Sequence, residues 1–228
     1  GFAGLNMNSV DFAFGGFFSI GTLSYAWAKL YRKSFLDSNK IEFGDYRYAE
    51  DKIYNYFCYI AGARYAFIDK KIYVYRRNEQ SVSNTYRKDG DKDWMRIAQD
   101  LQDKIDSLNY EKKQYSQDEI ENYESIVAWT IYFAAFFDGK MEYEYSTGKI
   151  RAVINLLKRY ASYDLTKKYL KNPLRYTKKI PALSYKIMLG GFAFLMKCNM
   201  YLLLSLGIKL LVDCHIDERL SDTGRKED

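Results

Sequence analysis

Two adjacent acidic residues, Glu50 and Asp51, stand where a stretch of helical periodicity begins. Apolar residues such as Ile53 and Phe57 recur after them at helical spacing, which predicts a helix over residues 51–62. At a helix start the macrodipole favours ionised carboxylates, and an accessible carboxylate can take a proton from an incoming hydroxyl group. The same position also suits an acidic helix cap. Either one acid of the pair acts as a general base beside the other, or the pair caps the helix.

The segments on either side of this helix predict an α/β fold for the first part of the chain. Residues 27–31 (WAKLY) and 67–76 (FIDKKIYVYR) have the aromatic and β-branched content of strands, and a turn is expected at residues 69–71. The short polar stretches SNK and FGD are expected to be connecting turns.

An ordered series of short motifs runs from Tyr25 to Ser83. It starts with Trp-x-Lys-Leu-Tyr, continues with Ile-x-Phe and the Glu-Asp pair, and closes with Tyr-x-Tyr-Arg and Ser-x-Ser. The residues are Trp27, Lys29, Leu30, Tyr31, Ile41, Phe43, Glu50, Asp51, Tyr73, Tyr75, Arg76, Ser81 and Ser83. This series resembles the second half of the catalytic domain of family 2 glycosyltransferases, which have the GT-A fold, of the type that builds capsule and cell-wall polysaccharides.

The resemblance implies a fold and an activity. The fold would be α/β, the C-terminal half of a GT-A-type mixed sheet followed by a mostly helical region. The activity would be transfer of a sugar from a nucleotide-sugar donor to a saccharide or lipid-linked acceptor, with inversion at the anomeric carbon. Asp51 matches the catalytic base of the family, and Glu50 would orient the site or bind the acceptor.

Four further residues receive roles from the same resemblance. Arg76 and Ser81 match positions near the donor diphosphate, and a guanidinium and a hydroxyl group suit phosphate oxygens. Trp27 and Lys29 would bind the acceptor. The residues themselves also allow simpler roles: core packing for Trp27, and solvated strand positions for Lys29 and Arg76.

One departure from the family is large. The family holds a divalent cation and the donor diphosphate with an upstream Asp-x-Asp motif, whereas residues 1–24 contain only Asp11. The nucleotide-binding half is thus missing, and we expect the chain to be an inactive fragment that binds no metal. Mg²⁺ or Mn²⁺ is expected for the full-length enzyme.

The rest of the chain predicts helices. Apolar stripes at helical spacing run over residues 94–108, 120–134 and 150–157, the second ending at Asp138-Gly139. Pro173 and Pro181 each stand near the start of an apolar segment, as helix N-termini permit. We expect three regions: a glycosyltransferase-like part (1–88), a helical part (89–148) and a basic, apolar helical part (149–228).

The C-terminal region is both basic and apolar. Residues 149–212 contain ten Lys and three Arg but one acid, Asp164. Within residues 180–214, three lysines interrupt an otherwise apolar sequence. Such a helix could lie on an anionic bilayer surface, with its lysines toward the head groups. A buried bundle helix and a membrane-spanning helix are the alternatives. Nucleic-acid binding is disfavoured because the lysines interleave with long aliphatic runs.

Composition adds limits to these interpretations. Three widely spaced Cys and a single His argue against a disulfide framework or a zinc site, and they favour a reducing cytoplasm. No signal peptide is visible, and the chain is expected to begin within a longer protein.

The expected location is the inner face of the cell membrane. The alternative function is a non-catalytic, membrane-associated helical binding module, in which Glu50 and Asp51 only cap a helix.

Overall fold

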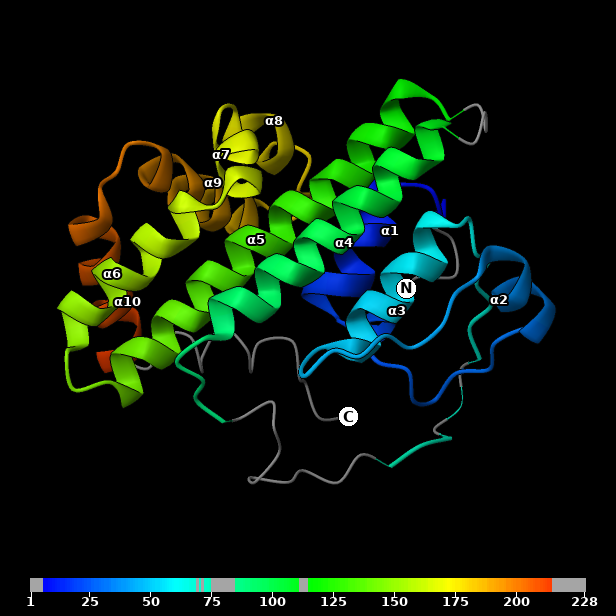
Figure 1. The fold of residues 1–228 in the computed structure, drawn as a ribbon, viewed down its shortest axis with the longest axis horizontal. Coiled ribbons are helices and arrows are strands. Elements are labelled where there is room, and N and C mark those ends of the chain that lie inside the picture. The colour runs from blue at the N-terminus through cyan, green and yellow to red at the C-terminus, as the bar shows by residue number, and fades with distance from the viewer. Residues whose placement is uncertain (1–5, 69, 71, 75–84, 111–114, 215–228) are drawn as a thin grey trace. The chain divides into compact units, whose positions relative to one another are not determined.

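A computed structural model describes residues 6–68, 70, 72–74, 85–110 and 115–214. These residues form helices joined by turns and loops, and none of the described residues lies in a strand (Figure 1). The fold of the described chain is therefore all-helical. The predicted α/β fold, with a partial GT-A-type mixed sheet, is wrong.

The reason for this error lies in both predicted strands. In residues 27–31, Ala28 has a φ of 56°, which is incompatible with an extended strand, and the segment forms a turn. The described part of residues 67–76 forms neither a helix nor a strand. Aromatic and β-branched side chains favour a strand only where a sheet supplies the ladder hydrogen bonds.

The described chain divides into two compact units. Unit 1 comprises residues 1–85 and 99–127, and unit 2 comprises residues 86–98 and 128–228. Two long helices, α4 (Gly90–Tyr110) and α5 (Gln117–Tyr145), contribute residues to both. The predicted division at residues 88 and 148 stays a prediction.

Unit 1 is built from short helices around an aromatic core. They are α1 (Val10–Phe14), the π-helical turn η2 (Gly15–Ser19), the 3₁₀ turn η3 (Thr22–Ser24), α2 (Lys33–Asn39) and α3 (Glu50–Ile60). Helix α3 confirms the helix predicted over residues 51–62. Its buried face carries Ile53, Tyr56 and Ile60, and the ring of Tyr56 packs on that of Phe17 at 4.5 Å.

Helix α5 starts with a reciprocal capping box. The Ser116 hydroxyl accepts from the Glu119 amide at 3.2 Å, and a Glu119 carboxylate oxygen accepts from the Ser116 amide at 2.8 Å. The helix then continues past Asp138-Gly139, where the sequence predicted its end. Gly139 is packed against α10, because a Cβ atom there would stand 2.8 Å from the Cδ1 atom of Ile208. This glycine allows close packing and does not end the helix.

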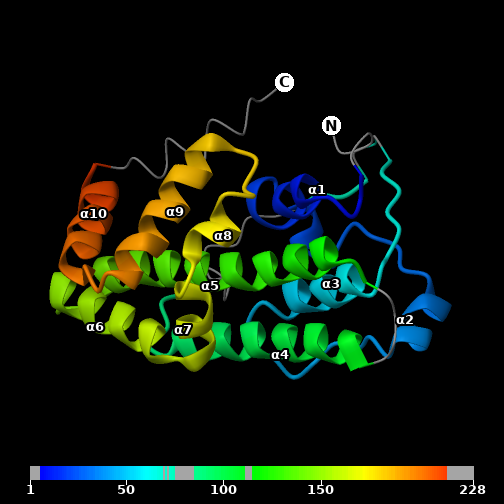
Figure 2. The same ribbon diagram turned by 90° about the horizontal axis from the view of Figure 1, so that it is seen from above.

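Among the described residues of unit 2, five helices follow α5. They are α6 (Lys149–Ser162), α7 (Asp164–Leu170), α8 (Pro173–Thr177), α9 (Leu183–Lys197) and α10 (Tyr201–Asp213). Helix α9 packs against α7, α8 and α10, and α10 packs against α6 (Figure 2). Pro173 is the first residue of α8, as predicted. The apolar residues 180–214 form two helices, separated by a turn in which Asn199 has a φ of 56°.

Two side chains of α5 satisfy the carbonyl ends of short helices. The indole of Trp129 donates to the carbonyl of Tyr176 at 3.2 Å, and the hydroxyl of Tyr132 donates to the carbonyl of Tyr169 at 3.0 Å. Both donors are buried. The last carbonyl groups of a helix have no hydrogen-bond partner within it. These two bonds supply partners for carbonyls at the C-terminal ends of α8 and α7.

We predict that Tyr132→Phe lowers the free energy of unfolding by about 1–2 kcal/mol, because it leaves a buried carbonyl without its donor. Urea denaturation followed by far-UV circular dichroism measures this. The matched control is Tyr145→Phe, which removes a hydroxyl from an exposed side chain. Equal stability of the two variants would contradict the role of the Tyr132 bond.

Candidate functional site

The predicted acid pair lies in the first turn of α3. The N-cap position is occupied by Ala49, whose side chain cannot accept a hydrogen bond, and Glu50 and Asp51 follow it. Ala49 has a φ of 55°, a conformation that L residues rarely adopt. Glu50 is exposed and Asp51 is half-buried. Neither acid therefore occupies the N-cap position.

The buried side-chain amide of Asn55 links Asp51 to the predicted acceptor-binding segment 27–31. It donates to the backbone carbonyl of Asp51 at 2.8 Å and accepts from the Tyr31 hydroxyl at 2.9 Å. Asn55 is 1% exposed. Burial raises the pKa of Tyr31, so its hydroxyl stays a donor at neutral pH. The start of α3 and the segment 27–31 are thus held together.

Lys29 lies within electrostatic reach of Asp51. Burial lowers the pKa of Lys29, and the negative charge of Asp51 opposes this shift. Its ammonium group donates to the backbone carbonyl of Thr22 at 2.7 Å and to that of Tyr25. An ammonium group has three donors, so one remains for another acceptor.

Three aromatic rings stack beside this lysine. The ring of Trp27 lies between those of Tyr25 and Tyr73, with centroids 4.8 Å away on each side and planes within 22° and 16° of parallel. Tyr25 and Tyr73 are each about half exposed. Such a stack offers apolar faces together with two polar phenol tips, which suits the apolar faces and hydroxyl groups of a sugar.

Of the predicted site residues, the structure brings Lys29 within electrostatic reach of Asp51. Trp27 and Glu50 are near these two residues in the sequence. Arg76 and Ser81 lie outside the described residues. Within the described ranges, no group of three or more His, Cys, Asp or Glu side chains is arranged to hold a metal ion.

Sequence analysis missed Lys52, the neighbour of Asp51. Its ammonium group lies 4.6 Å from the ring centroid of Phe18 and 5.8 Å from that of Tyr56. Burial lowers the pKa of Lys52 to about 8, so part of the population is a neutral amine in mildly alkaline solution. The signal that could have found it is a lysine in the first turn of a helix, where the dipole disfavours a cation.

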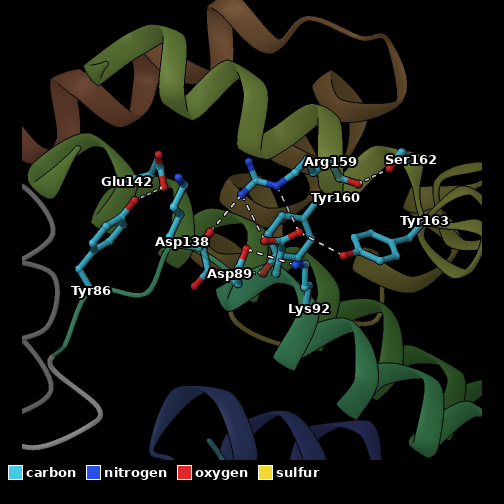
Figure 3. A network of polar contacts seen from close by, with 11 residues as sticks. Tyr86, Asp89, Lys92, Asp138, Glu142, Arg159, Tyr160, Ser162 and Tyr163 are labelled. Atoms are coloured by element: carbon cyan, nitrogen blue, oxygen red, sulfur yellow. Dashed lines mark hydrogen bonds and ion pairs between the residues drawn. The ribbon is translucent and has the colours of Figure 1, made fainter. Parts of the chain in front are cut away.

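A second polar cluster lies in unit 2 (Figure 3). Asp91, which is 1% exposed, accepts from Arg159 at 3.2 Å and from the hydroxyl of Tyr163 at 3.1 Å. Asp138 accepts from the hydroxyl of Tyr160 at 2.6 Å. These contacts join the start of α4 and the second half of α5 to α6 and the residue that follows it.

Asp138 is an acid of this cluster whose pKa is raised. Burial raises its pKa to about 6, and the charges of Asp91 and Asp93 add to this, whereas the Tyr160 hydroxyl and Arg87 act in the opposite direction. The carboxyl group can therefore exchange a proton near neutral pH. In the sequence, Asp138 is followed by Gly139, and this pair predicted only the end of a helix.

Compared with known proteins, the chain matches no family model, no curated protein and no solved structure. The resemblance to family 2 glycosyltransferases therefore depends on the motif series alone.

We predict that Asp138 makes the protein less stable as pH rises from about 4 to 6. Its folded-state pKa lies above the unfolded value, so the folded state binds more protons in this window. Stability then falls as pH rises, by at most about 1.4 kcal/mol for each pH unit. Asp138→Asn should flatten this part of the pH profile, measured by urea unfolding at several pH values.

The control for this experiment is Asp37→Asn, on an exposed carboxylate that pairs with Lys33. It should keep the wild-type slope between pH 4 and 6. An Asp138→Asn profile parallel to that of the wild type would show that the pKa of Asp138 is the same in the folded and the unfolded state.

Proposed function

We propose that this chain supplies the acceptor side of an inverting glycosyl transfer. In that reaction a sugar passes from a nucleotide-sugar donor to a saccharide or a lipid-linked acceptor. The observation that carries the proposal is the hydrogen-bonded link through Asn55 between the start of α3, which carries Asp51, and the segment 27–31, which carries Trp27 and Lys29. Lys29 lies within electrostatic reach of Asp51.

The chemical step requires a base close to the acceptor hydroxyl group. The carboxylate of Asp51 takes the hydroxyl proton while the acceptor oxygen forms a bond to the anomeric carbon. The bond between that carbon and the diphosphate oxygen breaks, and its electron pair leaves with the nucleoside diphosphate. Attack from the opposite face inverts the configuration, through an oxocarbenium-like transition state as in glycoside hydrolysis.

The neighbouring residues would bind and orient the two substrates. The exposed faces of Tyr25 and Tyr73, which stack on Trp27, contact the acceptor sugar. Lys29 uses its remaining N–H group to bind an oxygen atom of the acceptor sugar. Glu50, at the start of α3, orients the acceptor sugar. Arg76 and Ser81 bind the donor diphosphate in this proposal.

Donor binding needs groups beyond those described. In the part of the chain that the structure describes, no three or more His, Cys, Asp or Glu side chains are grouped to hold a metal ion. We propose that the donor and its cation are held by a nucleotide-binding segment outside residues 1–228, and that the chain alone neither transfers sugar nor hydrolyses nucleotide sugars.

The proposed place of action is the cytoplasmic face of the cell membrane. Over the part of the chain that the structure describes, no helix is both long and apolar enough to cross a bilayer. Peripheral attachment is consistent with this finding, and the basic C-terminal region would supply it. A lipid-linked acceptor would then be reached at the membrane surface.

The second candidate is a non-catalytic, membrane-associated helical binding module. The all-helical fold of the described residues favours it, because the sheet expected from the family resemblance is absent from them. In this module the Tyr25–Trp27–Tyr73 stack would bind a saccharide without any reaction. Dependence of turnover on Asp51 separates the two candidates.

We predict that Asp51→Asn in the full-length enzyme lowers transfer from labelled nucleotide sugars by about 10²–10⁴-fold, because the amide keeps the shape but cannot take the proton. Donor binding should be nearly unchanged. The matched control Asp37→Asn changes an exposed carboxylate on α2 and should leave transfer at the wild-type rate. Retained turnover in Asp51→Asn would remove Asp51 from the base role.

Acceptor binding can be tested separately on the chain itself. The three Trp residues give three indole N–H signals in NMR spectra. Addition of hexose or N-acetylhexosamine oligosaccharides should shift the Trp27 signal and leave that of the buried Trp129 in place. Trp27→Ala should abolish binding, and Trp27→Phe should restore part of it. Binding that is unaffected by Trp27→Ala would exclude the stack as the acceptor platform.

A further inference from the structure

The outer faces of α9 and α10 are apolar and exposed. On α9, Leu183 and Ile187 are 68% and 66% exposed, and Phe194 lies on the same side of the helix. On α10, Leu202, Leu203, Leu206 and Leu210 are each between 47% and 59% exposed. We call these seven residues the outer apolar face.

The inner faces of the same helices are apolar as well. Leu189, Phe192 and Met196 of α9 and Leu204 and Ile208 of α10 are buried in unit 2. A surface helix of a globular protein normally carries polar residues on the side away from the core. Helices that are apolar all round are typical of positions covered on both sides, so the outer apolar face indicates a second covering layer.

Basic residues border the outer apolar face. Lys186 and Lys197 are eleven residues apart on α9, so they lie on one side of the helix. Lys209 borders the face on α10, where it pairs with Asp213 in the last turn. From residue 165 to residue 212 the sequence contains no acid. The chemistry that complements this surface is apolar in the middle and anionic at the edge.

We infer that the outer apolar face of α9 and α10 inserts into the interfacial layer of an anionic lipid membrane. The two helices lie in the membrane plane, with leucine, isoleucine and phenylalanine side chains among the acyl chains and lysines at the head groups. Helices of 15 and 13 residues are too short to span a bilayer but long enough for this arrangement. This deepens the membrane location in the proposed function, but it does not depend on the sugar chemistry.

A second copy of the chain fits this surface less well. A twofold pairing would place the same patch of both copies together. The lysine edges of α9 would then face other lysines, with no acid between residues 165 and 212 to neutralise them. A lipid leaflet with anionic head groups supplies those negative charges.

Vesicle flotation of the whole chain tests the inference. We expect it to bind vesicles of phosphatidylcholine mixed with phosphatidylglycerol, to bind vesicles of phosphatidylcholine alone more weakly, and to lose affinity as salt rises toward ~0.15 M. Combining Ile187→Glu with Leu206→Glu should lower binding by at least about tenfold, because carboxylates then replace inserted side chains. Both positions are exposed, so helix content should not change.

Two controls separate the outer apolar face from general charge and hydrophobicity. Leu30→Glu introduces the same change at a fully exposed leucine in unit 1 and should bind like the wild type. Lys186→Gln with Lys197→Gln should weaken binding to anionic vesicles and reduce its salt dependence.

Three outcomes would overturn the inference. In the first, the wild type does not float with anionic vesicles at low salt. In the second, the Ile187→Glu, Leu206→Glu variant floats as much as the wild type does. In the third, the wild type does not bind vesicles but forms a stable dimer in sedimentation velocity, and this variant abolishes the dimer. The last result would assign the surface to a second copy. The assay contains no sugar, so failure here leaves the Asp51 test unaffected, and the reverse also holds.

Discussion

The hydrogen bonds from Trp129 and Tyr132 to the ends of α8 and α7 are the constraint on which unit 2 depends. These helices have five and seven residues, and helices of this length are not stable alone because nucleation is unfavourable. The two α5 side chains complete their open carbonyls in a buried environment, where an unpaired carbonyl would cost more than it does in water. Helix α9 packs on both short helices, so these bonds support part of the surface on which α9 lies.

In unit 1 the candidate site is formed where the backbone is least regular. Ala28 and Ala49 both have positive φ angles, and they directly precede Lys29 and Glu50. Positive φ is unfavourable for a residue with a Cβ atom, and it persists only where surrounding contacts enforce it. The Tyr31–Asn55–Asp51 hydrogen bonds and the carbonyl groups that bind Lys29 lie next to these two positions in the sequence. The candidate site therefore combines two unfavourable backbone conformations with a buried hydrogen-bond link.

Periodicity predicted the helices well, because apolar spacing reports directly which side of a helix is buried. It identified α3 and the stripes of α4, α5 and α6. The strands failed because their prediction required a sheet, and the sequence of one strand does not reveal whether a partner exists. Asp138-Gly139 was misread because a glycine at a helix end and a glycine under a crossing helix look alike in sequence. The grouping of Trp27, Lys29 and Asp51 came from a family resemblance. Lys52 and the Asp91–Arg159 pair depend on contacts between distant residues, which spacing cannot show.

The apolar sequence of residues 180–214 allowed a bundle core or a membrane surface, and the two interpretations are compatible. Packing in unit 2 requires one apolar face on each helix, and Leu189, Phe192, Leu204 and Ile208 provide it. The outer leucines and isoleucine remain between 47% and 68% exposed after this packing. Exposure of this apolar area to water is unfavourable. Since lysines border them and acids are absent between residues 165 and 212, the outer face has the composition of a surface that binds anionic lipid. Core packing accounts for one side of these helices, and lipid binding is the explanation that fits the other.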